Sequence, residues 1–241
     1  MKIYNRLSFA NLIRVRYLVA GFVLMTVTSP IHANVLLPGD TVSPDVFANP
    51  GSPPTLNITS GAFSFGSGMG LLTGTYFEAV LVDPLGITCA GCLDFAFQIN
   101  EDSGLSSGIF STGLSAFFGY TTDVGYVDGT GNMGASGGDG NPISVSRGPF
   151  GGGVSFVFVT PTSGAPIGPG GSSAILVVAT DATTYDSLGV LSINGGRQGS
   201  PANGQISGIF EPTFLLTPEP STALLLTLGL AGLAAFRKVA S

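Results

Sequence analysis

The chain has 241 residues, of which 44% are hydrophobic and only 9% are charged, far below the quarter of charged residues typical of a soluble domain. Two basic and 13 acidic residues lie between Asn34 and Thr217, so this part carries a net charge of −11, and it has no Lys, His or Trp. An acidic region without lysine is unsuited to neutralising phosphates, which excludes nucleic acid as a partner.

The first 33 residues have the pattern of a secretory signal peptide. Four basic residues precede an apolar stretch over residues 17–27, and the helix-breaking pair Ser29-Pro30 follows. Ile31 and Ala33 then stand at positions −3 and −1 of a cleavage site, so cleavage is predicted after Ala33. The alternative is an uncleaved amphipathic anchor, since the apolar stretch is too short to span a bilayer as a helix.

Residues 34–217 are predicted to form one all-β ectodomain. Short runs rich in Phe, Val, Ile and Thr alternate with Gly, Pro, Asn and Ser clusters, and no window has the 3.6-residue period of a helix. Many short strands separated by turns predict an antiparallel β-sandwich. The predicted strands are LLTGTYFEAVLVD (71–83), LDFAFQIN (93–100), GLSAFFGYTT (113–122), VSFVFVT (154–160), SAILVVAT (173–180) and LGVLSING (188–195).

Two of these segments also predict which side chains face the core. Leu93, Phe95, Phe97 and Ile99 occupy alternate positions, so they are expected on the core face of their strand. Both faces of the 154–160 segment are apolar, which indicates a central strand.

Cys89 and Cys92 are the only two cysteines of the chain. An exported chain with an even number of cysteines favours a structural disulfide between them. A thioredoxin-like redox site would need a βαβ context, and a zinc site would need more Cys or His ligands than residues 34–217 contain.

Carboxylates supply the only remaining acid–base chemistry. Glu78 lies within a predicted strand, and Glu101 and Asp102 lie in a predicted turn. A glycosidase would need two carboxyl groups about 5–10 Å apart across a sugar cleft, so a hydrolase using Glu78 and Glu101 is the least favoured function. Arrangements that rely on His or Lys are excluded, and no catalytic residue and no cofactor is predicted.

A Gly-rich loop over residues 129–142 carries oxygen-bearing side chains of the kind that bind calcium. The candidates are Asp123, Asp128, Asn132, Asp139 and Asn141. The spacing of an EF-hand is absent, so turn formation is the favoured explanation and no metal site is predicted. The glycosylation-like triplet at Asn57 is disregarded.

Residues 218–241 combine three features in order. Pro218-Glu219-Pro220 stands before the uncharged run 221–236, and Arg237 and Lys238 follow this run. As a helix the run is about 24 Å long, which is marginal for a membrane span. We expect a transmembrane helix over 221–236 with the basic pair as a stop on the cytoplasmic side. The two prolines keep the preceding triplet extended and accessible to a processing enzyme.

This tail resembles the PEP-CTERM sorting signal of Gram-negative bacteria. The resemblance rests on PEPST, the apolar run and the closing basic pair, and it covers about 24 residues. It implies that an exosortase, a membrane-embedded cysteine transpeptidase, cleaves the chain near Pro218-Glu219-Pro220. Thr217 stands where the commoner form of the signal has Val.

The ectodomain is similar to a recurrent group found on PEP-CTERM proteins. The similarity covers roughly residues 70–197 and rests on the order of TGTYFEAVLVDP, CAGCLDFAFQIN, GYTTDVGY, VSRG and VVATDATTYDSLGVLSINGG. It implies architecture and location, and no activity.

The expected protein is therefore a non-enzymatic surface or extracellular-matrix protein that passes through the inner membrane. The PEP-CTERM resemblance implies a structural or adhesive role with exopolysaccharide, as in a biofilm. The alternative is a carbohydrate-binding module that would use exposed aromatic side chains such as Tyr120 or Tyr126.

Overall fold

A computed structural model describes residues 34–47, 54–83, 88–103, 108–128, 140–159, 167–197 and 200–213, all within the compact unit Ala33–Ser241. The predicted signal peptide and the predicted transmembrane helix over 221–236 lie outside these described residues. Within the described ranges, no helix has the length and apolar character needed to cross a membrane.

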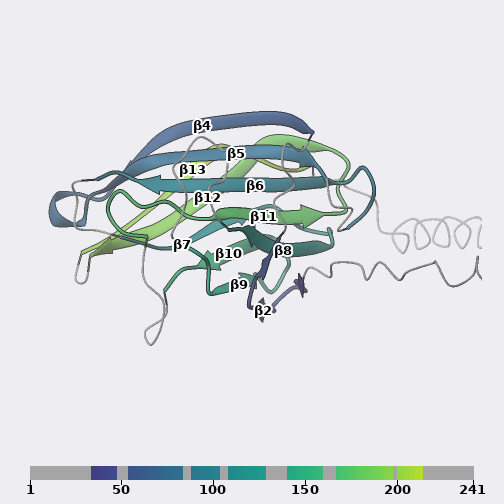
Figure 1. Cartoon of the computed structure of the whole chain (residues 1–241), viewed down its shortest axis with the longest axis horizontal. Helices are drawn as coiled ribbons and strands as arrows, with labels where there is room; N and C mark the ends of the chain where they lie inside the picture. Colours follow the sequence, from purple (N-terminus) through teal and green to yellow (C-terminus); the bar gives the residue numbers. More distant parts are fainter. Residues whose placement is uncertain are drawn as a thin grey trace, which may run out of the picture. The chain divides into compact units, whose positions relative to one another are not determined.

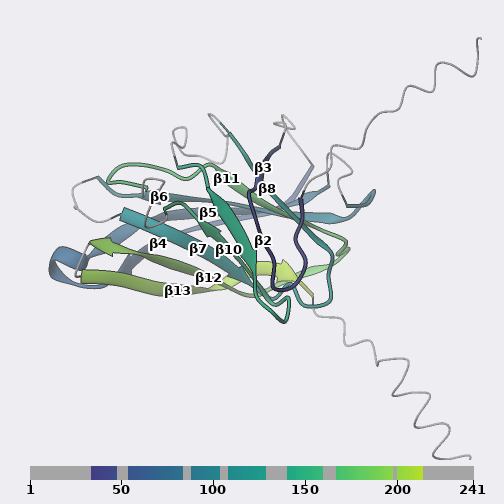
Figure 2. The ribbon, with the colours of Figure 1, turned by 90° about the horizontal axis from the view of Figure 1, so that it is seen from below.

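The strands form two sheets, and Figure 2 shows β6 and β11 in one layer and β12 and β13 in the other. The seven-stranded sheet runs β1 (Asn34–Val35), β8 (Thr122–Val127), β11 (Ile175–Thr180), β6 (Leu93–Glu101), β5 (Leu72–Val82) and β4 (Thr55–Phe65), with β3 (Asp45–Val46) beside β8. The six-stranded sheet runs β13 (Ser200–Pro212), β12 (Tyr185–Arg197), β7 (Gly108–Ser115), β10 (Gly153–Val157), β9 (Ser144–Arg147) and β2 (Thr41–Val42) (Figure 1).

The prediction of an all-β fold is confirmed. Among the described strands every pair is antiparallel except β3 with β8. The described residues contain one short 3-10 helix, Gly68–Gly70, in the turn between β4 and β5.

Aromatic side chains from both sheets build the core. Phe97 of β6 packs edge-to-face against Phe156 of β10, with ring centroids 5.5 Å apart. Phe95 packs in the same way against Phe117, at 5.8 Å. The alternation predicted for residues 93–99 is therefore correct, and β10 lies between β7 and β9 as the central strand that its two apolar faces indicated.

The sequence did not predict that the other face of β6 is buried as well. Asp94, Ala96 and Gln98 point away from the core, yet each is at most 2% exposed. Phe47 follows β3 and packs with Ala96 and its neighbours, so a segment distant in the sequence covers this outer face.

The predicted set of strands needs correction, since one predicted strand is divided and several strands were not predicted. Residues 113–122 are not one strand, because β7 ends at Ser115, Ala116 has a φ of 71°, and β8 begins only at Thr122. The edge strands β4 and β13 were missed because their Gly, Ser and Asn content is typical of turns. Gly204 of β13 is required where it stands, since a Cβ there would lie 2.0 Å from the ring of Phe65.

Replacement of Phe156 by Ala is expected to reduce the free energy of unfolding by about 3–5 kcal/mol, because it removes a fully buried ring between the sheets. Phe150→Ala is the matched control: this ring is 84% exposed, so the change should stay within about 0.5 kcal/mol. Urea unfolding of the two variants measures both values. Similar losses for the two would contradict the assignment of the core.

Candidate functional site

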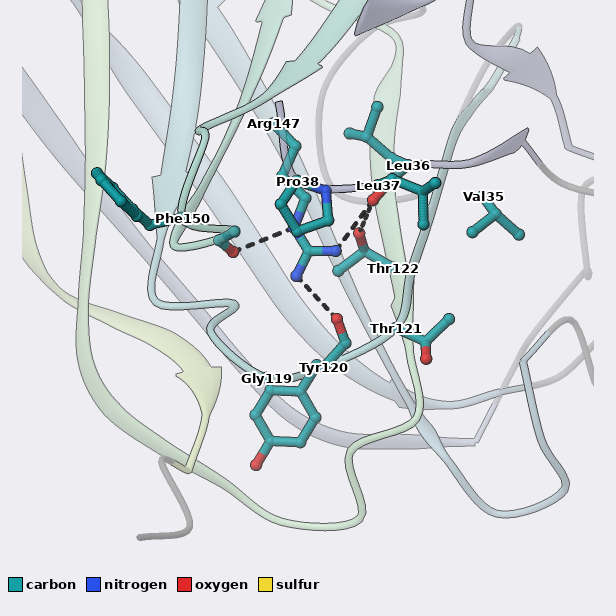
Figure 3. A pocket seen from close by; sticks show the side chains of 11 residues that line it. Val35, Leu36, Leu37, Pro38, Gly119, Tyr120, Thr121, Thr122, Arg147 and Phe150 are labelled. Carbon is teal, nitrogen blue, oxygen red and sulfur yellow. Dashed lines mark hydrogen bonds between the residues drawn. The ribbon is translucent and has the colours of Figure 1, made fainter. Parts of the chain in front are cut away.

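A pocket of about 290 Å³, shown in Figure 3, lies where the end of β9 meets the start of β8. Its walls are residues 35–38, the loop 119–122 that leads into β8, and the turn 150–151 between β9 and β10, together with Arg147. Val35, Leu37 and Phe150 give the pocket an apolar rim, since they are 51%, 59% and 84% exposed.

Arg147, at the end of β9, holds these walls together. Its side chain is 5% exposed, and its guanidinium donates only to backbone carbonyl oxygens in the hydrogen bonds that Figure 3 shows. Nε donates to Gly151 (3.1 Å), Nη1 to Leu36 (2.9 Å), and Nη2 to Phe117 (2.7 Å) and Tyr120 (2.8 Å).

Burial lowers the pKa of Arg147, whereas the charge of Asp181 acts in the opposite direction, and an arginine side chain stays protonated under such conditions. Arg147 fixes the pocket walls, because its N–H groups donate hydrogen bonds to backbone carbonyls in three separate segments. This arrangement leaves it poorly placed to bind an anionic ligand.

Tyr120 connects the pocket to the end of the described chain. Its hydroxyl donates a hydrogen bond to the carbonyl oxygen of Thr213, and the N–H of Thr213 donates to the carbonyl of Thr184 (3.1 Å). The ectodomain is therefore held in place up to Thr213.

Glu78 lies between the two sheets and not in a cleft. It pairs in register with core-facing Phe97, and it is 1% exposed. The register between β12 and β13 shifts around Gly189, and in this irregular stretch the N–H of Phe210 donates to Oε2 of Glu78 at 2.9 Å. Oε1 of Glu78 is buried and has no hydrogen-bond partner among the described residues. Burial raises the pKa of Glu78 to about 8, although the bond from Phe210 acts against this.

The structure does not bring Glu78 and Glu101 together as a catalytic pair. Glu78 lies opposite Phe97 and Glu101 opposite Gly74 on the same two strands. Four residues along a strand separate the two positions by roughly 13 Å, more than the about 5–10 Å that a glycosidase pair requires. Glu101 is buried, whereas the neighbouring Asp102 is exposed.

A group of acidic residues that the sequence did not reveal lies on the outer face of the seven-stranded sheet. Asp94 is 2% exposed, and its pKa is raised to about 8, first by burial and then by the charges of Asp83 and Asp123. Asp94 and Asp123 both pair with Ala179, so one strand separates them and their backbones lie roughly 10 Å apart. Only the pairing of strands places these residues on one face.

The calcium candidates do not form a metal site in the part of the chain that is described. Asp123 is buried, Asp128 is exposed, and Asn141 is half-buried. Asn132 and Asp139 lie outside the described residues. Across the described ranges, no group of three or more His, Cys, Asp or Glu side chains could hold a metal ion.

Cys89 and Cys92 are joined by a disulfide in the structure, with Cα atoms 5.4 Å apart. The N–H of Cys92 donates to the carbonyl of Cys89, and Gly91 between them has a φ of 83°. The carbonyl of Cys92 in turn accepts from the N–H of Asp83 (2.7 Å). The pair thus belongs to the turn that leads into β6.

The expectation that Tyr120 and Tyr126 are exposed is wrong. Both side chains are half-buried, and Tyr126 packs against the main core cluster. Burial raises the pKa of Tyr126, and Asp128 adds to this. Among the described residues, the exposed large aromatic side chains are instead Phe150 (84%), in the turn Gly148–Gly151 between β9 and β10, and Phe118 (45%).

The buried carboxyl groups predict a pH-dependent stability. The pKa values of Glu78 and Asp94 are raised to about 8, and burial together with Asp186 raises that of Glu211 to about 7. These folded-state pKa values lie above those of the unfolded chain. The free energy of unfolding is therefore highest below about pH 4, where the groups are protonated in both states, and it falls as the pH rises to about 8. Glu78→Gln retains an acceptor for the N–H of Phe210 and removes the titration.

Urea unfolding at pH 5 and pH 9 should therefore show a difference of a few kcal/mol in the wild-type chain and a smaller one in Glu78→Gln. Asp102→Asn is the control, because this exposed carboxyl should leave the difference unchanged. An equal difference in Glu78→Gln and wild type would show that Glu78 is ionised in the folded protein.

The comparisons with known proteins concern the tail. Residues 216–238 match the model of the PEP-CTERM protein-sorting motif, so the match contains Pro218-Glu219-Pro220, the apolar run and the basic pair Arg237 and Lys238. No curated protein and no solved structure matches the chain. The chain therefore carries, directly after an all-β ectodomain, a PEP-CTERM motif, which indicates an exported protein that transits the membrane and is processed by exosortase.

Proposed function

We propose that this protein is a non-enzymatic surface or extracellular-matrix component, released from the inner membrane when exosortase cleaves near Pro218-Glu219-Pro220. The sorting-motif match over residues 216–238 carries this proposal. In it, residues 1–33 direct export and are removed after Ala33, the 221–236 helix holds the chain in the membrane, and Arg237 and Lys238 stop transfer.

The position of the ectodomain supports processing of the tail. Thr213 is held by Tyr120 and Thr184, and seven residues separate it from Ser221. Two of these seven are prolines, which disfavour helix and keep the segment extended. A membrane-embedded enzyme would thus meet an accessible peptide next to a folded domain.

Several observations favour a structural or adhesive role for the ectodomain. Residues 34–217 have no His or Lys, and Glu78 and Glu101 lie apart. The guanidinium of Arg147 beside the pocket already donates its hydrogen bonds to backbone carbonyls. We place this role in the exopolysaccharide or biofilm context that the sorting class implies. No specific observation favours the carbohydrate-binding module, because Tyr120 and Tyr126 are half-buried and the chain has no Trp.

Intact mass and cell fractionation of wild type beside Glu219→Ala test the proposal. The wild-type chain should begin at Asn34, end near Pro218 and leave the inner membrane, whereas Glu219→Ala should keep Ser241 and remain there. Thr227→Ala, which changes the apolar run but not the triplet, should behave as wild type. If wild type also keeps Ser241 in the membrane, the tail is an ordinary anchor and the proposal is wrong.

A further inference from the structure

Most of the large apolar side chains that are exposed in the described residues lie at one end of the sandwich. We call this end the exit end; it comprises residues 34–38 with β1, the loop 116–121, the turn 148–152, the start of β12 and the end of β13. Its exposed apolar side chains are Val35 (51%), Leu37 (59%), Phe118 (45%), Phe150 (84%) and Leu188 (76%).

Hydrogen bonds and register place these segments at the same end. Arg147 connects residue 36, the loop 117–120 and the turn at Gly151. Gly153 pairs with Ser115, and Asp186 pairs with Glu211, two residues before Thr213. Figure 2 shows the yellow tip of β13 and the purple first strands on the same side of the sandwich.

Phe150 is presented by rigid structure. The turn that carries it is closed by the bond from the N–H of Gly151 to the carbonyl of Gly148 (2.8 Å), and Arg147 holds the carbonyl of Gly151. Val35 and Leu37 line the other side of the pocket. The apolar rim is therefore fixed before any partner binds, and exposed apolar side chains gathered around one pocket are a feature of interaction sites.

The short segment between Thr213 and the proposed membrane helix indicates which partner the exit end contacts. Only seven residues separate Thr213 from Ser221, so the exit end can stand at most roughly 25–30 Å from the start of the proposed membrane helix. We propose that the exit end rests on the bilayer surface while the tail is still in the membrane, with Phe150, Leu37 and Val35 inserted among the lipid headgroups. This inference rests on the proposed function of the tail.

The charge of the ectodomain defines the lipid chemistry. Asp181 and Asp186 lie near this end, and Arg147 is buried, so anionic headgroups would be repelled rather than attracted. The contact is thus an apolar insertion that a zwitterionic surface accommodates best. It would hold the ectodomain in one orientation and keep the Pro218-Glu219-Pro220 peptide close to the membrane.

The absence of Trp from the chain makes a direct test available. The chain from Asn34 to Ser241 carrying F150W, which corresponds to the proposed membrane-bound form, has a single indole. It can be reconstituted into phosphatidylcholine vesicles with acyl chains brominated near the headgroup. If Phe150 inserts to a depth of about 5–10 Å, the bromines should quench the emission by about half and the emission maximum should shift to the blue.

L37W is a second reporter on the opposite wall of the pocket, and it should be quenched as well. S67W is the matched control, because Ser67 is exposed in the turn between β4 and β5 at the other end of the sandwich. Its emission should stay red-shifted and unquenched.

Flotation of the same samples separates this inference from the proposed function. If the chain floats with the vesicles but F150W and L37W are not quenched, the tail is in the membrane and the surface contact is wrong. A blue shift of the indole emission without bromine quenching would show that the exit end is covered by a second copy of the chain and not by lipid. A chain that does not float overturns both the proposed tail function and this inference.

Discussion

The exit end of this protein depends on the hydrogen bonds that the buried guanidinium of Arg147 donates to backbone carbonyls. Taking a cation out of water is costly, and here four hydrogen bonds to backbone carbonyls offset that cost. Leu36, Tyr120 and Gly151 lie far apart in the sequence, and each supplies one of the carbonyls. Without the planar, multiply donating side chain of arginine each of these carbonyls would lose one donor, and lysine does not provide the same fork of donors.

The same cluster connects the two ends of the ectodomain. Leu36 stands three residues after the predicted cleavage site, and its carbonyl accepts bonds from both Arg147 and Thr122. The carbonyl of Tyr120 accepts a hydrogen bond from Arg147, and the hydroxyl of Tyr120 donates one to the carbonyl of Thr213. Leu36 and Thr213, which lie near the two ends of the described chain, are thus both connected to Arg147 or its partner Tyr120. In the proposed function, this geometry places a folded body directly beside the sorting segment.

Particular residues show how far the sequence could predict the structure. The alternation from Leu93 to Ile99 predicted a core face because it is a local pattern. The burial of Asp94 and Gln98 could not be predicted, since this face is covered by residues distant in the sequence, such as Phe47 beside Ala96 and Ser173 beside Gln98, only in the folded sheet. For the same reason, no local pattern could show that Glu78 meets the N–H of Phe210 across the sandwich. The tail could be predicted because its motif is linear.

Arg147 itself had a weak signal in the sequence, as one of two basic residues in an acidic region of 184 residues. Its partners are backbone carbonyls, which no sequence pattern identifies. The tyrosines were misjudged for a related reason: an aromatic residue in a turn-rich segment can be a platform or part of the core, and only the packing decides between them.

Amide hydrogen exchange of wild type beside Arg147→Lys would test the role of this cluster most directly. The account predicts that the amides of Leu36, Phe117 and Gly151 lose about tenfold or more of their protection together, because one side chain holds all three segments. Amides in the β4–β5 hairpin between Ser60 and Phe77 should keep theirs. Unchanged protection at Leu36 and Phe117 would contradict the account, since these segments would then be held by something other than Arg147.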